Sequence, residues 1–328
     1  MNELRAAVIG VGRLGAIHAR KYATIPHLKL THVVDTDAAR AAEIATELGA
    51  TALTDHRQLA GAIDLASVAA PGISHHAIAS DLMRAGIDVL VEKPMAATLA
   101  EARDLKALAE RGGRVLQIGH LERFNPAIVR LRSILKAPRF VECHRLAPFT
   151  ERGTDVDVVL DLMVHDLDVI LSATGAAEVV ALEALGVAVL TDQIDVANAR
   201  IRFANGLIAN LNTSRVAPRR ERKIRFFQPD AYISVDYEAR RIQVYRKSPP
   251  APGATFPTIS ADQIDLGDAD PLMDEILAFV HSVRARSVPQ VTADDGLRVM
   301  ELSERIRVEM EKESAAFQGE ARRGSRDD

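Results

Sequence analysis

Two residues in the stretch DVVLDLMVHDLDVIL are suited to moving a proton at a hydroxyl group. Asp161 and His165 lie four residues apart, a spacing that places both on one face of a predicted helix. A carboxylate beside an imidazole holds the ring in one orientation and raises its proton affinity. A solvated acidic stripe is the alternative, because the segment also carries Asp157, Asp166 and Asp168.

Lys93 is the third candidate for this chemistry. It follows the apolar run VLV at 89–91 and stands between Glu92 and Pro94. Parallel sheets deliver the C-terminal ends of their strands to a cofactor crevice, and Pro94 disfavours a helix at Lys93. A lysine and a histidine that converge on a secondary hydroxyl can take its proton and stabilise the alkoxide while a cofactor accepts the hydride. The alternative is a surface ion pair between Lys93 and Glu92.

The stretch AAVIGVGRLG has the spacing G-x-G-x-x-G between a predicted strand and a predicted helix. Gly10 permits a tight turn, Gly12 lets the backbone approach a pyrophosphate, and Gly15 allows close packing of helix on strand. The N–H groups at the start of the helix then face the anion. These residues predict a dinucleotide site, and an ordinary tight turn is the alternative.

Asp35 ends the next predicted strand, 20 residues after Gly15, which is near the spacing of a carboxylate that binds a ribose 2′-hydroxyl. Asp35 and Asp37 together repel a 2′-phosphate, which favours NAD over NADP, whereas the nearby Arg40 favours the phosphate. In the alternative interpretation, Asp35 is a helix cap.

Short apolar runs alternate with helical stretches over the first 120 residues. The predicted strands are 5–9, 29–34, 65–70, 88–91 and 115–118, and the predicted helices between them include 38–48, 74–85 and 99–111. This alternation predicts an α/β fold that begins with a doubly wound parallel sheet, a Rossmann domain over residues 1–120.

The pattern changes after residue 120. Helices are predicted at 126–135, 157–173, 271–284 and 293–312, and β-like runs follow one another from 179 to 246 with a hairpin turn at 204–206 and a loop at 247–258. We therefore expect an α+β domain with a largely antiparallel sheet over 121–314. The polar residues 315–328 are expected to be disordered.

Composition narrows the function classes. The 328 residues suggest two domains, and a net charge of −4 argues against a nucleic-acid binder. Cys143 is the only cysteine, which excludes an internal disulfide and fits a cytoplasmic protein. We expect no signal peptide, no membrane insertion and no metal site. An open antiparallel sheet predicts burial against another subunit, hence a homodimer or homotetramer.

The chain resembles the glucose-fructose oxidoreductase/inositol dehydrogenase family (Gfo/Idh/MocA). The matching stretches, in order over roughly residues 5–170, are VIGVGRLGAIHARKY, APGISHHAIASDLMRAGIDVLVEKPMA, GHLERFNPA and DLMVHDLDVI. The resemblance implies that Lys93 of the Glu-Lys-Pro motif is catalytic, together with Asp161 and His165 of the D-x-x-x-H helix. The chain departs from many members at Met163, where they have glycine.

The same resemblance implies NAD as the cofactor and a P-x-x-x-H segment, Pro71 to His75, beside it. The expected cofactor contacts are Gly10, Gly12, Arg13, Leu14, Gly15, Asp35, Thr36, Pro71, His75, Glu92, Lys93 and His120.

Within the family, the chain is similar to UDP-N-acetylglucosamine 3-dehydrogenases of lipid A precursor biosynthesis. The supporting stretches are GHLERFNPA, GTDVDVVLDLM, ANARIRFANG and SRVAPRRERKIRFFQPDAYISVDY. This resemblance implies oxidation of a nucleotide sugar at its 3-hydroxyl, with an aminotransferase as a possible downstream partner. Two alternatives remain open, a dehydrogenase of a free polyol such as an inositol and a non-catalytic NAD-binding sensor.

A basic run over 215–225 fits the nucleotide-sugar hypothesis, because arginine binds a pyrophosphate through paired hydrogen bonds. A solvated hairpin edge is the alternative for this run. The expected substrate contacts are Arg123, Asn125, Arg215 and Arg219, although Arg123 could instead form an ion pair at the domain interface.

Overall fold

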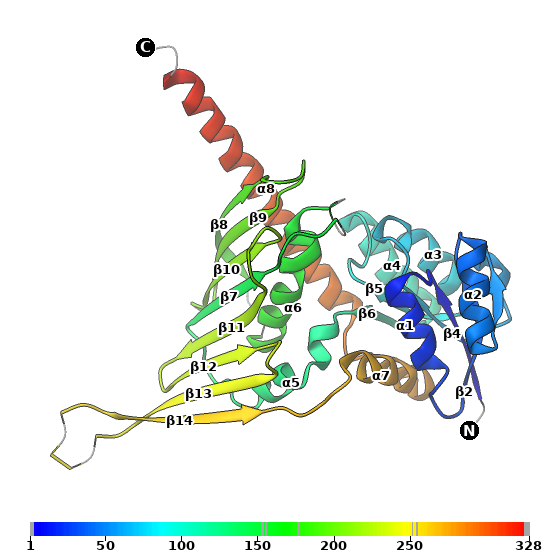
Figure 1. Ribbon diagram of the computed structural model, residues 1–328, viewed down its shortest axis with the longest axis horizontal. Helices are drawn as coiled ribbons and strands as arrows, with labels where there is room; N and C mark the ends of the chain where they lie inside the picture. Colours follow the sequence, from blue (N-terminus) through cyan, green and yellow to red (C-terminus); the bar gives the residue numbers. More distant parts are fainter. Residues whose placement is uncertain are drawn as a thin grey trace. The chain divides into compact units, whose positions relative to one another are not determined.

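The computed structural model describes residues 3–151, 154, 156–175, 178–250, 252–253 and 255–324 (Figure 1). They divide into two compact units, 1–124 with 270–300 and 125–269 with 301–328. The expected assignment of all of 121–314 to one domain therefore differs from the structure over 270–300. The periodicity of this segment predicts its helices, but it does not indicate which sheet their apolar faces cover.

The first unit contains a six-stranded parallel sheet with the strand order β3-β2-β1-β4-β5-β6. This order is that of a doubly wound dinucleotide-binding domain. The strands are β1 (Leu4–Ile9), β2 (Leu28–Val34), β3 (Thr51–Leu53), β4 (Leu65–Val68), β5 (Asp88–Glu92) and β6 (Leu116–Gly119). The expected Rossmann domain is confirmed; β3 was not predicted, because three residues are too few to show an apolar pattern.

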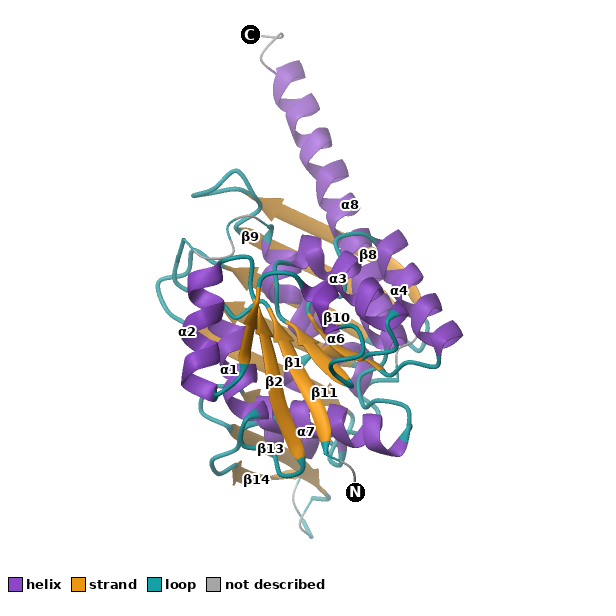
Figure 2. Cartoon of the chain, turned by 90° about the vertical axis from the view of Figure 1, so that its right-hand side faces the viewer, coloured by secondary structure: helices purple, strands orange, loops and turns teal. Residues whose placement is uncertain are grey.

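Helices cover both faces of this sheet. They are α1 (Arg13–Tyr22), α2 (Ala38–Leu48), α3 (Gly72–Arg84), α4 (Leu99–Gly112) and α7 (Pro271–Ala285). Figure 2 shows α1 and α2 on one side of the strands and α3 and α4 on the other. The start of α8 (Ala293–Gly324) also belongs to this unit.

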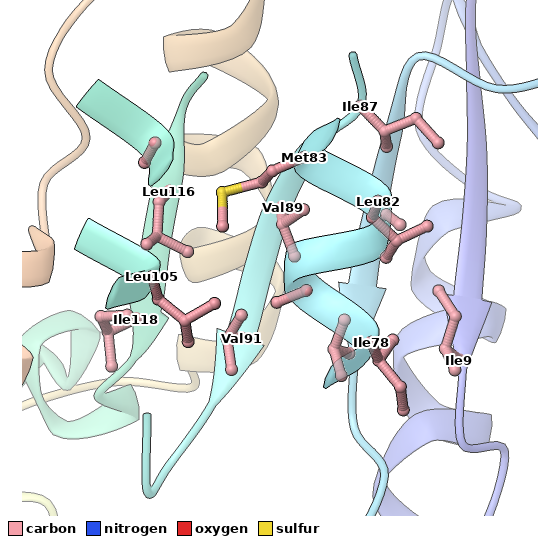
Figure 3. Close-up of a cluster of buried hydrophobic side chains, with 14 of the residues drawn as sticks. Ile9, Ile78, Leu82, Met83, Ile87, Val89, Val91, Leu105, Leu116 and Ile118 are labelled. Carbon is pink, nitrogen blue, oxygen red and sulfur yellow. The ribbon is translucent and has the colours of Figure 1, made fainter. Parts of the chain in front are cut away.

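Strand β5 shows how the two apolar layers hold the sheet. Val89 and Val91 pack in the core with Leu82 of α3, as Figure 3 shows. Leu90 points to the opposite face and belongs to the cluster that includes Phe279 of α7. Because both faces are buried, the strand is continuously apolar, and each such side chain contributes about 1.5–3 kcal/mol when fully buried.

The second unit contains an eight-stranded sheet with the order β14-β13-β12-β11-β7-β10-β9-β8. The strands are β7 (Phe140–Leu146), β8 (Val179–Val187), β9 (Val196–Phe203), β10 (Ile208–Ser214), β11 (Glu221–Gln228), β12 (Ala231–Asp236), β13 (Arg241–Ser248) and β14 (Thr258–Asp265). All neighbours pair antiparallel except β7 and β10, which are parallel, so the largely antiparallel expectation is confirmed. Strand β14 was not predicted.

One face of this sheet carries the core and the helices. Alternate residues of β9, among them Ala197, Ala199 and Ile201, are buried, whereas their neighbours are exposed. Helix α5 (Pro126–Arg132), a π-helical turn over Val159–Met163 and α6 (Val164–Ala173) lie against the sheet. The opposite face carries a row of aromatic rings.

Helix α8 extends to Gly324, whereas the sequence favours disorder from residue 315. The remaining expectation of disorder, over 325–328, lies outside the described residues. Within the described part of the chain, no helix is long and apolar enough to cross a membrane.

Candidate active site

The glycine loop between β1 and α1 leaves space where a phosphate would sit. Gly10 has a φ of +80°, and a Cβ on it would lie 2.6 Å from the Cα of Ala70. A Cβ on Gly15 would lie 1.7 Å from the carbonyl oxygen of Gly10, so both positions need glycine for packing. At Gly12, by contrast, an added Cβ would meet no atom within 4 Å. The loop is therefore tightly packed at Gly10 and Gly15 and open at Gly12.

Helix α1 begins in this open space. Its N-cap is Gly12, which has no side chain to occupy the first N–H groups of the helix. Arg13 is exposed and Leu14 half-buried beside it. A helix start with free N–H donors attracts anions such as a pyrophosphate. The residues expected to contact a dinucleotide thus form a cradle that fits NAD.

Asp35 is tied to this loop from the end of β2. Its carboxylate accepts hydrogen bonds from the N–H of Val11 at 2.8 Å and the N–H of Asp37 at 3.0 Å. Asp37, not Asp35, is the N-cap of α2, since its side chain accepts from the N–H groups of Ala39 and Arg40. The cap interpretation of Asp35 is therefore wrong, and Asp35 stands half-buried beside the exposed Thr36.

Arg40 is engaged within the protein. Its Nε donates to the carbonyl of Val11 at 2.9 Å, and its guanidinium pairs with Glu43 at 2.6 Å. Glu43 offsets the charge that could have attracted a 2′-phosphate. This arrangement agrees with a preference for NAD.

Lys93 comes directly after β5 and is half-buried, and its peptide bond to Pro94 is cis. Glu92 is only 9% exposed, and its carboxylate lies 3.1 Å from Nε2 of His18. The alternative of a surface ion pair between Lys93 and Glu92 therefore does not describe Glu92, whose carboxylate points into the unit.

His75 of α3 lies next to Pro94, on the other face of the parallel sheet from His18. It is 1% exposed, with Nδ1 2.7 Å from the carbonyl oxygen of Pro94 and Nε2 2.8 Å from that of Ala70. Pro71, the N-cap of α3, is exposed. Both nitrogens of His75 thus contact the backbone, which gives the residue a role in shaping the two loops, and its contact with a cofactor stays a prediction.

The segment after β6 carries three of the predicted site residues. His120 is buried, and Arg123 pairs with Asp295 of α8 at 3.3 Å. Burial alone would raise the pKa of Asp295, but the N–H of Thr292 and the charge of Arg123 outweigh it and lower that pKa. Asp295 belongs to the same unit as Arg123. Asn125 caps α5, since its side-chain oxygen accepts from the N–H of Ala127 at 3.0 Å.

Asp161 and His165 lie in the second unit, in the π-helical turn and in the first turn of α6 respectively. Both are half-buried. The π-helical turn widens the backbone spacing, so the predicted four-residue spacing is not that of a regular α-helix, and such turns are frequent at functional sites. Met163, where the sequence departs from many family members, is completely buried.

The other aspartates of this segment do not form a solvated stripe. Asp157, Asp166 and Asp168 are all buried. Asp166 accepts two hydrogen bonds of 2.8 Å from Arg145, which itself lies over the ring of Tyr237. The alternative interpretation of this helix is therefore wrong.

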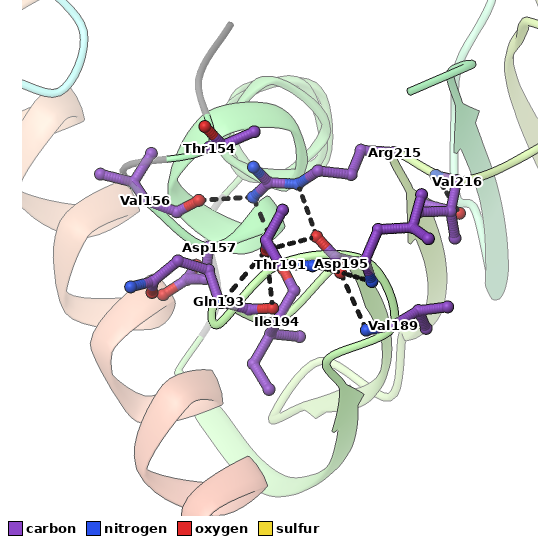
Figure 4. A network of polar contacts seen from close by, with 12 residues as sticks. Thr154, Val156, Asp157, Val189, Thr191, Gln193, Ile194, Asp195, Arg215 and Val216 are labelled. Atoms are coloured by element: carbon purple, nitrogen blue, oxygen red, sulfur yellow. Dashed lines mark hydrogen bonds and ion pairs between the residues drawn. The ribbon is translucent and has the colours of Figure 1, made fainter. Parts of the chain in front are cut away.

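Arg215 differs from the expectation of a substrate contact. It is 4% exposed and pairs with Asp195 at 3.5 Å, and it donates to the carbonyl of Val156, as Figure 4 shows. Because Asp195 is completely buried, the pair holds β10 to the loop before β9. We therefore assign Arg215 to the scaffold of the second unit. The basic run in the sequence includes Arg215, but it does not indicate that the buried carboxylate of Asp195 pairs with it.

Arg219, a third arginine expected to contact substrate, is exposed and lines a pocket of about 260 Å³. The cations around this pocket are Arg219, Arg220, Arg222 and Lys223, and the anions are Glu221, Asp236 and Glu238. Arg220 pairs with Glu238 at 3.6 Å and Lys223 with Asp236 at 3.4 Å. No ion pair of Arg219 is found with any described residue.

Three buried polar residues near Lys93 were not predicted from the sequence. His18 and Tyr22 of α1 and Ser67 of β4 lie in one hydrogen-bonded group with Glu92. The four-residue spacing of His18 and Tyr22 places them on one helix face, which is the signal that could have found them.

Comparison with known proteins agrees with a dinucleotide-dependent oxidoreductase. Residues 4–120 match the family described as "Oxidoreductase family, NAD-binding Rossmann fold", and residues 128–234 match the "GFO/IDH/MocA C-terminal domain". The chain belongs to the GFO/IDH/MocA family, and its cofactor is NAD.

Two relatives indicate the range of activities among similar proteins. UDP-N-acetylglucosamine 3-dehydrogenase of Acidithiobacillus ferrooxidans is 40% identical over 95% of this chain and 98% of its own. A crystal structure of that enzyme has a TM-score of 0.87 at 39% identity, covering 95% of this chain and 99% of that one. Myo-inositol dehydrogenase Hyg17 of Streptomyces leeuwenhoekii is 31% identical over 66% of this chain and 71% of its own.

Proposed function

We propose that this chain oxidises the 3-hydroxyl of UDP-N-acetylglucosamine to a ketone. The hydrogen on carbon 3 leaves as hydride to NAD, and the hydroxyl proton goes to a base on the protein. The observation that carries the proposal is the 40% identity to a UDP-N-acetylglucosamine 3-dehydrogenase over 95% of the chain. NAD supplies the hydride acceptor when bound, and the side chains of this chain orient the sugar and move the proton.

Lys93 is the residue we propose to act directly on the hydroxyl. It stands at the C-terminal end of β5, the edge at which parallel sheets present residues to a bound dinucleotide. In our proposal its amine takes up the proton or stabilises the developing alkoxide. Removing such a group typically costs about 10²–10⁴ in rate.

His165 is the second residue assigned to the reaction, and Asp161 is assigned to orienting it. An imidazole whose orientation is fixed by a neighbouring carboxylate serves as a general base. The half-burial of both residues suits this role, because a reacting group has to be reached by substrate. Lys93 belongs to the first unit, and His165 and Asp161 belong to the second.

The pocket beside Arg219 is the proposed location of the pyrophosphate. Among its four cations, Arg220 pairs with Glu238 and Lys223 pairs with Asp236. Arg219 is exposed, and a guanidinium binds a phosphate through two parallel hydrogen bonds. A nucleotide sugar brings this pyrophosphate, whereas a free polyol does not, so the pocket favours the nucleotide sugar.

Neutralising the pocket tests this assignment. The double substitution Arg219→Gln and Arg222→Gln should raise the KM for UDP-N-acetylglucosamine by about 10- to 100-fold, which corresponds to the loss of one charged hydrogen bond of about 1.5–3 kcal/mol. The matched control is Arg246→Gln, an exposed arginine of β13 that pairs with Asp262. An unchanged KM in the double variant would place the pyrophosphate elsewhere.

A free polyol is the second candidate substrate, favoured by the similarity to myo-inositol dehydrogenase Hyg17. A nicotinamide-reduction assay over UDP-N-acetylglucosamine, other UDP-sugars and myo-inositol separates the two. We expect turnover with UDP-N-acetylglucosamine and none with myo-inositol. The reverse pattern overturns the proposed substrate, and NAD binding without turnover of any sugar favours a sensor.

The chemistry of the product points to the class of the next enzyme. A sugar ketone is a substrate for an aminotransferase, so we propose such an enzyme as the next step, in lipid A precursor biosynthesis in the cytoplasm.

A homodimer or homotetramer is also part of the proposal. The open face of the second sheet carries a row of aromatic rings, Phe140, Phe227, Tyr232 and Tyr245. Neighbouring rings are tilted and have centroids 5.0–5.5 Å apart, and such a row suits burial against another subunit.

A further inference from the structure

We propose that two buried histidines, His18 and His75, are positioning residues that hold Lys93 from opposite faces of the parallel sheet. One binds the residue before Lys93 and the other binds the residue after it. The inference rests on the catalytic role proposed for Lys93. It adds a positioning role for His18 and His75.

The contact on the first side joins α1 to the end of β5. His18 is completely buried, and its Nε2 lies 3.1 Å from a carboxylate oxygen of Glu92. The other face of that carboxylate is closed by β6, since a Cβ on Gly119 would lie 2.9 Å from its Oε2. Glu92 is therefore fixed between a helix and a neighbouring strand.

The orientation of His18 is itself determined by two further residues. Its Nδ1 lies 3.2 Å from the hydroxyl of Ser67, which lies 2.9 Å from the hydroxyl of Tyr22. Burial raises the pKa of Tyr22, so this hydroxyl keeps its proton and can donate. A chain of donors from Tyr22 through Ser67 and His18 to Glu92 leaves the imidazole one orientation.

The contact on the second side joins α3 to the residue after Lys93. Nδ1 of His75 lies 2.7 Å from the carbonyl oxygen of Pro94, and its Nε2 lies 2.8 Å from that of Ala70. The start of α3 also packs on the proline ring, since a Cβ on Gly72 would lie 3.1 Å from Cγ of Pro94. His75 thus ties the loop after β5 to the loop after β4.

The two contacts come from different helix layers. Tyr22 of α1 packs in the core on one face of the sheet, and Ile78 of α3 packs in the core on the other. Lys93 lies just after the end of β5 and outside the regular elements, so the contacts of Glu92 and Pro94 help to fix its backbone. Misplacing a reacting group by about 1 Å can cost about 10²-fold in rate, which makes such contacts matter.

A metal site is the competing explanation of the group around His18. Ligand atoms of His18, Glu92 and Glu275 all lie within 4.8 Å of one another. Both nitrogens of His18 already contact Ser67 and Glu92 at hydrogen-bonding distances, which suits a positioning role. If dialysis against EDTA abolishes turnover and zinc restores it, the metal explanation holds and ours is overturned; unchanged turnover supports ours.

The amide side chains of asparagine and glutamine provide a crossed test. The nitrogen of asparagine takes the place of Nδ1, and that of glutamine takes the place of Nε2. His18→Gln keeps the donor to Glu92 whereas His18→Asn loses it. His75→Asn keeps an N–H at the position of Nδ1, beside the carbonyl oxygen of Pro94, whereas His75→Gln does not. The contact next to Lys93 is thus kept by glutamine in place of His18 and by asparagine in place of His75.

We expect kcat to fall about 10- to 100-fold in His18→Asn and His75→Gln, with much smaller losses in the other two variants. The dissociation constant for NAD should stay unchanged in all four. If the histidines only stabilise the fold, the same amide should be the more harmful one at both positions. The proposal is therefore overturned if asparagine lowers kcat more at both positions, if glutamine does so at both, or if NAD binding is lost in parallel with kcat. Ser67→Ala should lower kcat, whereas Ser80→Ala, a buried serine of α3 outside the group, should not.

A second readout needs no substrate and so separates this inference from the proposed function. The rate at which an amine-acylating reagent modifies Lys93 is measured by mass spectrometry against Lys29, an exposed lysine of β2. Acylation of Lys93 should be faster in His18→Asn and His75→Gln than in the wild type. Equal or slower rates in these two variants contradict the positioning role even if the substrate is as proposed, and faster rates support it even if the substrate is different.

Discussion

At the scale of the residue, two aspartates of one loop have different functions. Asp35 accepts the N–H of Val11 in the glycine loop, whereas Asp37 accepts N–H groups of α2 and begins that helix. Both are acidic and lie next to the predicted cofactor site, so residue type alone does not separate them. The hydrogen-bond partners do, because only Asp35 accepts a hydrogen bond from the glycine loop, which we propose to bind the dinucleotide.

Asp35→Ala should weaken NAD binding. We expect the dissociation constant to rise about 10- to 100-fold, since a carboxylate that binds a ribose hydroxyl contributes about 1.5–3 kcal/mol. Isothermal titration calorimetry measures this change. Asp37→Ala is the matched control and should cost only about 1 kcal/mol of stability as a lost cap. If both variants bind NAD equally well, the ribose is held by another residue.

Lys93→Met should lower kcat by about 10²–10⁴-fold while NAD affinity is kept. Methionine preserves much of the length of the side chain and removes its charge and its proton. Steady-state kinetics and a fluorescence titration of NAD give the two numbers, with Lys29→Met as the control. Full activity in Lys93→Met would remove Lys93 from the reaction.

At the scale of the element, most of the fold follows from the spacing of apolar residues. The helices over 38–48 and 99–111 and the strands around Lys93 were predicted nearly to their ends. The π-helical turn before α6 was not, because its residues have the composition of an ordinary helix and the extra residue per turn is set by packing. Strand β14, all but one of whose residues are exposed, has no apolar alternation to reveal it.

The site was predictable only in part, for a related reason. Gly10, Gly15 and Asp35 could be found because the local chain geometry dictates their types. The ion pair of Arg215 was not predicted, since its partner Asp195 lies 20 residues earlier and pairing across strands is not visible in a local pattern. His18 was missed for the same reason, as its partner Glu92 lies on a distant strand.

The turn between β8 and β9 should make the stability of the second unit depend on pH. Burial alone would raise the pKa of Asp195, but the N–H groups of Leu190, Thr191 and Val189 outweigh it and lower the pKa to about 2. A lowered pKa stabilises the fold above the unfolded value near 4, and this contribution is lost as pH falls toward 2. We expect a loss of about 2 kcal/mol over that range, measured by urea unfolding.

Asp195→Asn should remove this pH dependence and destabilise the second unit by about 3 kcal/mol or more, because it removes the buried carboxylate that pairs with the buried Arg215. The neighbouring Asp192→Asn, at an exposed position of the same turn, is the control and should change neither quantity. An Asp195→Asn protein as stable as the wild type at pH 7 contradicts the scaffold role.

At the scale of the whole molecule, the chain forms its first unit from two separate segments. Residues 270–300 return to this unit after the second unit is complete, and α7 packs in the same core as α1 and β5. The second unit leaves the aromatic row on its sheet face, where Phe227 lies between Phe140 and Tyr232. Such a face is stabilised by association.

Light scattering after size exclusion should give the mass of a dimer or a tetramer. Phe227→Glu should shift the protein toward the monomer, because it places a charge in the centre of the aromatic row. Val180→Glu, an exposed position of β8, is the control that should leave the mass unchanged. A wild-type protein that is monomeric at micromolar concentration contradicts the proposed assembly.

The most direct measurement traces the hydrogen that leaves the sugar. UDP-N-acetylglucosamine carrying deuterium on carbon 3 is incubated with the enzyme and NAD, and the reduced nicotinamide is examined by mass spectrometry. Oxidation of the 3-hydroxyl predicts NADH that contains the deuterium, together with a ketone at carbon 3. Reduced cofactor without deuterium, or no reduced cofactor at all, would contradict the proposed reaction.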